Sequence, residues 1–354
     1  MPISIHVFGG TKGESIVLEL PDGTWGVVDC HTNSTSDLGG NLVASFLNDR
    51  GVDSLRFICL THPHDDHFSG VMQLLENFAV QQFWHFDGIS VARLKQLIKA
   101  KLKDGLKDEK STGRKTNARE LAKLWKEVNA RSRKGAIIVQ RLSLGHSCIP
   151  PEEGLGFTVQ SIGPSPRQSQ RFEERLKHAF DAKGNFLPTA NHRDPNLCSC
   201  GLLIEYGKTR IILGGDIEEG GWTDLITQRK FLLEGMSLVK IAHHGSPNGY
   251  VEGLWQLHNN CVQTTYKILT PYKRFDLPKK STIDHVRNYG AEIYSAGHPY
   301  FDHEFVPSYV VSLARLKSGE PTESGTTSRV SMTFDDAGQL SSAPDVAGDA
   351  MQIC

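Results

Sequence analysis

Long apolar runs are missing from this sequence of 354 residues. No stretch approaches the roughly 20 apolar residues that a membrane-spanning helix needs, and residues 1–10 lack the charged segment and long apolar core of an export signal. We therefore expect a protein that is neither embedded in a membrane nor exported, with the cytoplasm as its location. Hydrophobic residues make up 38% of the chain, which at this length is enough for a sizeable core.

Paired cysteines and a large net charge are also missing. The seven cysteines are an odd number, are scattered and include no CxxC pair, which argues against a disulfide framework and favours buried thiols in a reducing compartment. Cys198 and Cys200 lack the second cysteine pair that a soft-metal site needs. The 39 basic and 40 acidic residues leave the chain nearly neutral, so any surface for nucleic acid must be local.

The first third of the chain has alternating β and α patterns. Residues 3–8, 15–20 and 25–28 are short β-rich runs separated by glycine, proline and aspartate turn signals, which predicts a β-meander. Apolar residues at helical spacing predict a helix over 37–50. The apolar run 55–60 is typical of a buried strand.

A lysine-rich segment then interrupts the pattern. Residues 91–134 contain 15 basic and five acidic residues, and their leucines recur at helical spacing. We interpret the region of about 90–135 as a helical insertion. Its positive excess suits a phosphate backbone or a protein partner, and a merely solvated helical face is the equally weighted alternative.

The remaining chain returns to mixed structure within one predicted domain, 1–340. The expected elements are strands at 136–144, 201–206, 209–213, 238–242, 266–269 and 329–334, a helix at 171–180 and a polar loop at 184–196. We expect 329–334 to be an edge strand. Residues 341–354, rich in small and polar residues, are predicted to be a flexible tail.

The clearest chemical signal is a histidine cluster that follows the buried strand. His62, His64, Asp66 and His67 form an HxHxDH pattern directly after the apolar run 57–60. Three imidazoles and a carboxylate on a loop that leaves a strand are suitable ligands for a borderline divalent metal such as zinc. Histidines that serve only packing have no reason to cluster in this way, so we predict a metal site.

With this motif the sequence resembles the metallo-β-lactamase fold hydrolases. The resemblance implies an α/β (α+β) fold, the four-layer αββα sandwich, with two divalent metal ions at one edge of its two sheets. Zinc is the expected metal, with manganese as the alternative. The implied ligands are His62, His64, Asp66, His67, Asp216 and His244.

Two aspartates fit further motifs of that family. Asp29 ends the strand at 26–28 and matches an acid that orients the metal loop without being a ligand. Asp216 follows Gly214-Gly215 after the strand at 209–213 and matches the carboxylate that bridges two cations.

His243 and His244 supply the last motif, after the strand at 238–242. Neighbouring side chains on an extended segment point in opposite directions, so we expect one to be a ligand and the other to face substrate. His244 is the predicted ligand, although the spacing leaves the choice open. Lys240, Lys273, Arg274, Lys279 and Lys280 are candidates for a positive rim nearby.

Within the family the sequence is similar to the ComEC-type subgroup, as a stand-alone member without membrane helices. The resemblance rests on His-His-Gly-Ser at 243–246, on Gly-Gly-Asp at 214–216 and on Asn196-Leu197-Cys198-Ser199. Many relatives place a third histidine ligand where Asn196 stands. Asn196, His192 or water therefore completes the first metal site.

The subgroup implies a phosphodiesterase or nuclease, with a phosphate-containing substrate such as nucleic acid. Hydrolysis would use a metal-activated water, with Asp66 as its orienter and the free one of His243 and His244 as proton donor to the leaving group. Two alternatives remain open. One is an ester, lactone or lactam hydrolase of the same fold. The other is a subunit of a multi-protein system, for example a defence-related one, that docks through the insertion and has a regulated metal site.

Overall fold

The computed structural model describes ten segments of the chain. They are residues 1–9, 13–32, 41–86, 112–178, 195–259, 265–290, 292–298, 310–311, 328–348 and 350–353. The first half of the predicted insertion, His192 and nearly all of the predicted polar loop lie outside these segments.

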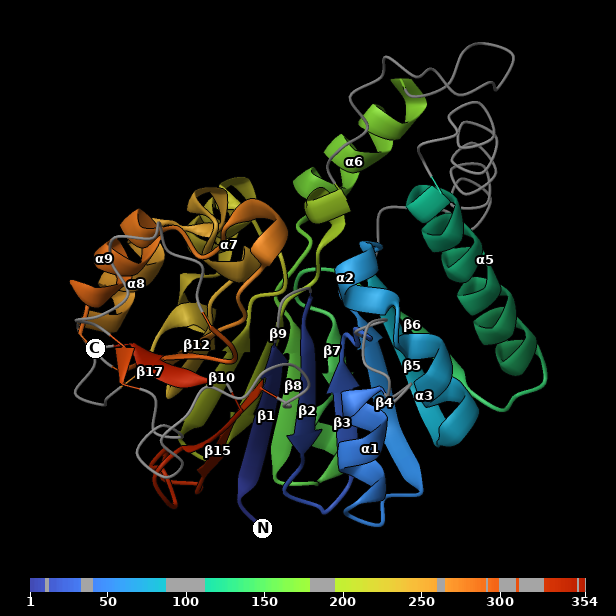
Figure 1. The fold of residues 1–354 in the computed structure, drawn as a ribbon, viewed down its shortest axis with the longest axis horizontal. Helices are drawn as coiled ribbons and strands as arrows, with labels where there is room; N and C mark the ends of the chain where they lie inside the picture. Colours follow the sequence, from blue (N-terminus) through green and yellow to red (C-terminus); the bar gives the residue numbers. More distant parts are fainter. Residues whose placement is uncertain are drawn as a thin grey trace.

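Two β-sheets form the centre of the molecule (Figure 1). The first has the spatial order β16 (Asp345–Ala347), β15 (Ser328–Phe334), β1 (Ile3–Gly9), β2 (Ser15–Glu19), β3 (Trp25–Val28), β4 (Ser54–Leu60), β5 (Ala79–Phe86) and β6 (Ile138–Leu142). The second has the order β14 (Val310–Val311), β17 (Met351–Ile353), β13 (Ile293–Ser295), β12 (Tyr266–Leu269), β11 (Leu238–Lys240), β10 (Thr209–Leu213), β9 (Leu202–Tyr206), β8 (Phe157–Ser161) and β7 (Ser147–Ile149).

Each sheet changes from antiparallel to parallel pairing along its width. In the first sheet β1, β2 and β3 form the predicted antiparallel meander, and β3 to β6 run parallel. In the second, β8, β9 and β10 are antiparallel, whereas β10 to β13 run parallel. Parallel strands end at the same edge of a sheet, so the residues after β3, β4, β10 and β11 are brought together there.

Helices cover the outer faces of both sheets (Figure 1). On the first sheet these are α1 (Leu42–Asn48), α2 (Asp65–Phe68), α3 (Val71–Asn77) and α5 (Thr112–Arg133). On the second they are α7 (Glu219–Arg229), α8 (Glu252–Asn259) and α9 (Lys280–Arg287), while α6 (Pro166–His178) stands above the junction. The four layers are those expected of an αββα sandwich, so the predicted fold class is confirmed.

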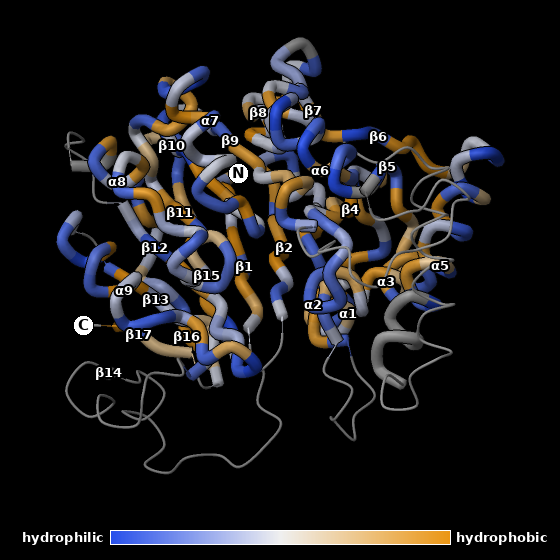
Figure 2. The backbone as a smooth tube through the Cα atoms, turned by 90° about the horizontal axis from the view of Figure 1, so that it is seen from above, coloured by the Kyte–Doolittle hydropathy of each residue, from blue (hydrophilic) through white to orange (hydrophobic). Residues whose placement is uncertain are grey.

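Alternation along the strands creates two apolar cores. In β10, Ile211 packs in the core between the sheets, whereas Ile212 packs with Trp222 of α7 and Leu254 of α8. Successive strand residues point to opposite faces, which is why both faces of this strand are apolar. Figure 2 shows hydrophobic stretches along the central strands, and both hydrophobic and hydrophilic stretches on the surrounding helices.

Helix boundaries differ from the sequence pattern where capping decides them. The Asn41 side-chain oxygen accepts hydrogen bonds from the backbone N–H groups of Val43 and Ala44, so α1 begins at Leu42. Residues 37–40, which the pattern assigns to this helix, lie outside the described segments. Helix α6 begins at Pro166, five residues before the predicted start, because proline suits the first helical turn.

Helix α5 confirms the helical character of the second half of the predicted insertion. The apolar residues expected on one face are buried, and Trp125 lies edge-on to His85 with ring centroids 4.6 Å apart. The buried residues of this face are Leu121, Leu124, Trp125 and Val128. The opposite face leaves Lys123, Lys126 and Arg133 exposed, and Lys134, directly after the helix, is exposed as well.

Two predictions for the C-terminal part are wrong. Strand β15 is not at an edge, since it pairs with β1 on one side and with β16 on the other. Residues 341–354 are not a flexible tail either, because β17 pairs with β13 and β14 and buries Met351 and Ile353. Partner strands from distant parts of the chain order this segment, and its own composition does not reveal them.

No helix among the described segments is both long and apolar enough to span a bilayer. The cysteines that the structure describes, Cys30, Cys59, Cys148, Cys198 and Cys200, are buried free thiols, as expected.

Buried His6 links stability to pH. Its Nδ1 lies 2.9 Å from the Ser331 hydroxyl, and burial together with the charges of Arg50 and Arg329 lowers the pKa of His6 from 6.5 to about 3. Between these values the unfolded chain binds a proton that the folded chain does not. The contribution of His6 is therefore complete above pH 6.5 and decreases as the pH falls toward 3, by about 1.4 kcal/mol per pH unit.

We predict that His6→Asn, which keeps a group able to bond Ser331, removes about one proton from this dependence. Urea unfolding at several pH values from 7 to 4 measures the slope in both proteins. Identical slopes would contradict the predicted burial of a neutral imidazole.

Candidate metal centre

The predicted site residues meet at the shared edge where the parallel strands end. The loop 61–64 follows β4, Asp216 follows β10, and His243 and His244 follow β11. Both sheets therefore contribute residues to the site, which lies at the junction between them.

One group consists of His62, His64 and Asp216. Their potential ligand atoms all lie within 4.8 Å of one another, and His62 Nε2 is 3.5 Å from Asp216 Oδ2. His62 is fully buried, Asp216 is almost so, and His64 is half-buried on the solvent side.

A second group consists of Asp66, His67 and His244, with ligand atoms again within 4.8 Å. Asp66 Oδ2 is 3.7 Å from His67 Nε2 and 3.3 Å from His244 Nε2. Asp216 joins the two groups, because its Oδ1 lies 3.5 Å from His67 Nε2 while its Oδ2 faces His62. This is the placement expected of a bridging carboxylate.

Asp29 fixes the orientation of the loop behind these groups. Its carboxylate accepts hydrogen bonds from the Thr61 N–H at 2.8 Å and the Thr61 hydroxyl at 2.6 Å, and it lies 2.7 Å from His67 Nδ1. His67 therefore donates from Nδ1 and turns Nε2 inward. Because the Thr61 hydroxyl donates to Asp29, it accepts from His62 Nδ1 at 3.0 Å, and His62 Nε2 also faces inward.

His244 is held in the same way from the second sheet. Its Nδ1 lies 3.0 Å from both the carbonyl and the hydroxyl oxygen of Thr270, which follows β12. The Thr270 hydroxyl donates to Glu14 at 3.0 Å, and Glu14 forms a fully buried ion pair with Lys240. Lys240 is thus not part of a positive rim, as its position in the sequence suggested, but links the two sheets behind the site.

A third group, Glu14, Asp29 and His67, also has ligand atoms within 4.8 Å. Asp29 already faces three donors, and Glu14 is paired with Lys240. We interpret this deeper group as the support of the site.

Backbone strain occurs where the loops enter the site. Asp29, His243 and His244 have φ values of 55°, 49° and 53°, which non-glycine residues seldom adopt. The pair of histidines is therefore not extended as predicted. Both rings turn toward the carboxylates, and His243 Nε2 lies 3.8 Å from Asp216 Oδ2.

Gly215 lets Asp216 reach its position. It has a φ of 50°, and an added Cβ would lie 2.8 Å from the Ser199 hydroxyl and 3.0 Å from the Cys200 carbonyl oxygen. Ser199 in turn accepts a hydrogen bond from the Asp216 N–H at 2.9 Å. The Gly-Gly-Asp sequence is thus required by space as well as by conformation.

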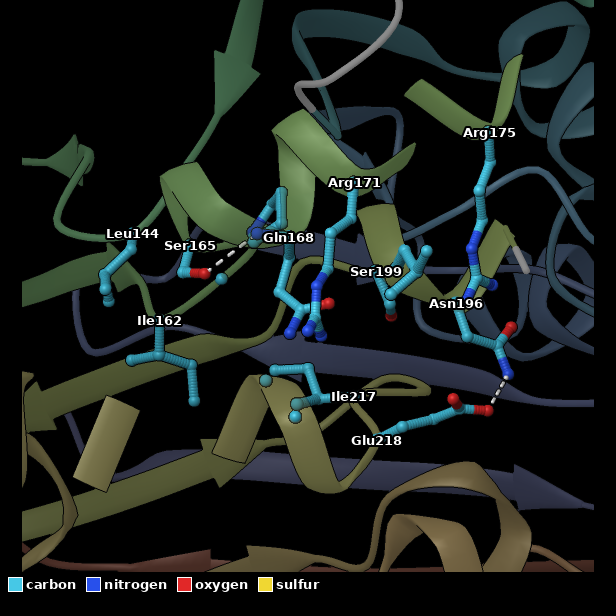
Figure 3. A pocket seen from close by; sticks show the side chains of 15 residues that line it. Leu144, Ile162, Ser165, Gln168, Arg171, Arg175, Asn196, Ser199, Ile217 and Glu218 are labelled. Carbon is cyan, nitrogen blue, oxygen red and sulfur yellow. Dashed lines mark hydrogen bonds between the residues drawn. The ribbon is translucent and has the colours of Figure 1, made fainter. Parts of the chain in front are cut away.

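His243 occupies a more open position than His244, with 20% of its side chain exposed. Its Nδ1 is 3.6 Å from Glu218, and its Nε2 is 3.5 Å from the Asn196 amide nitrogen. Asn196 donates to Glu218 at 3.0 Å (Figure 3). Asn196 therefore lies beside His243, and its own Oδ1 is buried without a hydrogen-bond partner among the described residues. His192, the other candidate for the first group, lies outside the described residues.

The site concentrates charge. Although burial opposes it, the carboxylates of Asp216, Asp66 and Asp29 raise the pKa of His67 well above its ordinary value. Burial and the charge of His67 lower the pKa of His62. Against the effect of burial, His67 and its neighbouring histidines hold the pKa of Asp66 and of Asp216 well below the usual range.

The donor set fits divalent cations. His67 Nε2, His244 Nε2 and Asp216 Oδ1 are buried, and among the described residues none of them has a hydrogen-bond partner. Leaving such groups unpaired is costly, whereas imidazole nitrogens and carboxylate oxygens are the ligands that zinc accepts. His62 and His64 on one side, and Asp66, His67 and His244 on the other, are therefore donors available to a divalent metal, and Asp216 lies between the two groups.

Comparison with known families agrees with this geometry. The family model described as the metallo-beta-lactamase superfamily matches residues 9–298. The chain belongs to the metallo-β-lactamase superfamily. It is accordingly a member of a superfamily of metal-dependent hydrolases, and the histidine and aspartate groups at the junction of its sheets are candidates for the metal site.

Solved structures with a similar fold are distant. A diphosphatase from the PhnP family is 11% identical, with 75% of this chain and 85% of that chain covered and a TM-score of 0.36. Zn²⁺-bound PqqB from Methylobacterium extorquens is 11% identical, with 67% and 71% covered and a TM-score of 0.35. A long form RNase Z from yeast is 7% identical, with 75% and 36% covered and a TM-score of 0.39.

No curated protein matches this sequence. Membership of the superfamily therefore rests on the family model over residues 9–298.

Sequence reasoning missed the residues that support the site from behind. Thr61, Glu14 and Thr270 carry no motif of their own. A lysine inside the apolar run Leu238–Ala242 was a signal for a buried partner, since lysine is rarely buried unless paired. Glu218, two residues after Asp216, gave no signal.

We predict that the purified protein binds about two zinc ions per chain and that zinc raises its thermal midpoint. His64→Ala and Asp216→Asn each remove a donor, so elemental analysis should find less zinc and thermal unfolding a smaller shift. His146→Gln, a histidine outside these groups, is the control and should behave like the wild type. Equal zinc content in all four proteins would refute the assignment.

We also predict strong coupling between Lys240 and Glu14. Lys240→Met leaves a buried unpaired carboxylate and should cost about 3–5 kcal/mol in the free energy of unfolding. Adding Glu14→Gln should recover most of this loss, because the neutral amide still accepts from Thr270. Urea unfolding of the two single variants and the double variant measures the coupling, and additive effects would argue against a buried ion pair.

Proposed function

We propose that this protein is a dinuclear zinc-dependent phosphodiesterase or nuclease. The observation that carries the proposal is the junction of the two sheets, where Asp216 lies between two groups of histidine and aspartate donors. Two cations at such a site supply Lewis acidity that activates water and stabilises the negative charge on the phosphoryl oxygens.

The chain's own residues supply the remaining steps. Asp66, held close to His67 and His244, would orient the attacking water from the second group. His243 is the proton donor to the leaving group, because Thr270 occupies the Nδ1 of His244 while His243 is partly exposed beside Glu218. The Glu218 carboxylate lies 3.6 Å from His243 Nδ1 and would orient the ring toward the substrate.

Three segments support the ComEC-type subgroup and its phosphodiester substrates. The Asn196 amide lies beside His243, and the Ser199 hydroxyl accepts from the Asp216 N–H. These contacts join the segments Asn196–Ser199, Gly214–Asp216 and His243–Ser246 at the site. The exposed lysines of α5 are consistent with a nucleic-acid backbone as the partner.

The test is hydrolysis by the zinc-loaded protein. We expect it to cleave bis(p-nitrophenyl) phosphate, oligonucleotides or cyclic nucleotides, and we expect His64→Ala and Asp216→Ala to lose activity by about a hundredfold or more, because several kcal/mol of charge stabilisation depends on the metals. His146→Gln should retain full activity. Equal rates for the wild type and both site variants would exclude the proposal.

A parallel panel of esters, lactones and lactams separates the bond classes. Turnover of these without turnover of any phosphodiester would replace the proposal with an ester hydrolase of the same fold. The same zinc-loaded sample should be used for both panels, so that metal content cannot explain a difference.

A further inference from the structure

A pocket lies beside the candidate metal centre. It has a volume of about 180 Å³, and one wall is formed by Asn196, Ser199, Ile217 and Glu218. These residues belong to the loops that carry Asp216 and contact His243. The pocket therefore begins where the reacting group would be held.

The opposite wall is positively charged. Gln168, Arg171 and Arg175 of α6 line the pocket, and their spacing of three and four residues places them on one helix face. Figure 3 shows Arg171 and Arg175 extending from the helix toward the Asn196 and Ile217 side. Within the described segments, Arg171 forms no ion pair, and it is exposed.

Packing holds this wall in place. The Ser165 hydroxyl donates to Asp224 of α7 at 2.6 Å and accepts from the Gln168 N–H at 3.1 Å. Asp224 is also paired with Arg167, which does not line the pocket. The acidic partner on α7 is thus engaged by the start of α6, and Arg171 remains available to a ligand.

The first turn of α7 leaves room for the arginine. Gly220 lines the pocket, and an added Cβ would lie 2.9 Å from Gln168 Nε2 and 3.8 Å from an Arg171 guanidinium nitrogen. Glycine weakens a helix, and alanine would be the favourable residue here if only the helix mattered. The N-terminal end of α7 also favours negative charge in its vicinity.

We propose that this pocket binds a second phosphoryl group of the substrate, next to the phosphodiester that is cleaved. The inference rests on the proposed function for the class of substrate. Arginine binds phosphate through two parallel N–H donors, which fits the exposed guanidinium groups on this wall. Drug-sized ligands occupy roughly 300–1,000 Å³, so the pocket takes a group of phosphate size rather than a whole nucleotide.

Glu218 places a negative charge at one end of the pocket. Its carboxylate accepts from Asn196 at 3.0 Å and from Asn248 at 2.7 Å, and it faces His243. An anion in the pocket would avoid this corner and bind at the α6 wall. The substrate would then lie with its second phosphate toward Arg171 and its leaving group toward His243.

The first test measures anion binding without hydrolysis. Sulfate, a tetrahedral dianion, is titrated into chelator-treated protein at constant ionic strength, and the thermal midpoint is followed. We expect a saturable rise in the wild type, and an apparent sulfate affinity at least about tenfold lower in Arg171→Gln and in the double variant with Arg175→Gln, because a charge-assisted contact is lost. Lys177→Gln removes one positive charge from the exposed surface of α6 outside the pocket and should bind like the wild type.

Three outcomes overturn the proposal. They are the absence of a saturable rise in the wild type, an equal rise in the double variant, and an equal effect of acetate, which would indicate a carboxylate site. Gly220→Ala adds an independent check, since it should stabilise the helix while weakening sulfate binding by narrowing the pocket.

The second test compares dinucleotides with and without a terminal phosphate, using zinc-loaded protein. Arg171→Gln should lower kcat/KM at least about tenfold for the phosphorylated substrate and less than about twofold for the other. An equal loss on both overturns the assignment. If no phosphodiester is hydrolysed by the wild type, the proposed function fails, whereas sulfate titration still decides whether the pocket binds phosphoryl groups.

Discussion

The buried carboxylate of Asp29 is the constraint on which the site depends. It sits at the end of β3 in a left-handed conformation, completely shielded from solvent, and faces three donors from Thr61 and His67. Burial raises its pKa, so its charge is sustained only by those donors. The carboxylate in turn determines which nitrogen of each ring faces inward. One residue outside the donor groups thus orders the loop that contains them.

On the second sheet, a different set of polar residues orients His244 in the same way. His244 contacts Thr270, which follows β12 of the second sheet, and Thr270 donates to Glu14, which precedes β2 of the first sheet. Glu14 in turn pairs with Lys240 of β11, so this chain of polar contacts joins the two sheets behind the site. Buried charges of this kind are costly unless every partner is present. Their retention is understandable if they fix the relative position of two sheets whose loops must meet to within a coordination distance.

Chemistry and recognition are separated in space. The donor groups and His243 occupy the ends of parallel strands, where the backbone is fixed by the sheets. The arginine wall lies on α6, which stands above the junction and is joined to α7 through Ser165 and Asp224. Superfamily membership accounts for the first part. The second lies on a helix outside the strand-end loops, and in the proposal above it contributes to the choice of substrate.

The sequence alone determined the fold class, the strands of the meander and the histidine and aspartate residues that meet at the junction of the sheets, because periodicity and histidine clustering are local signals that survive without a structure. Tertiary structure decided what depends on distant partners. Pairing with β13 ordered the C-terminal strand, and two left-handed residues turned both His243 and His244 inward where an extended chain would have separated them. Lys240 became a buried link through Glu14, 226 residues away in the chain. Such contacts leave no periodicity in the sequence, because they arise only when the two sheets pack together.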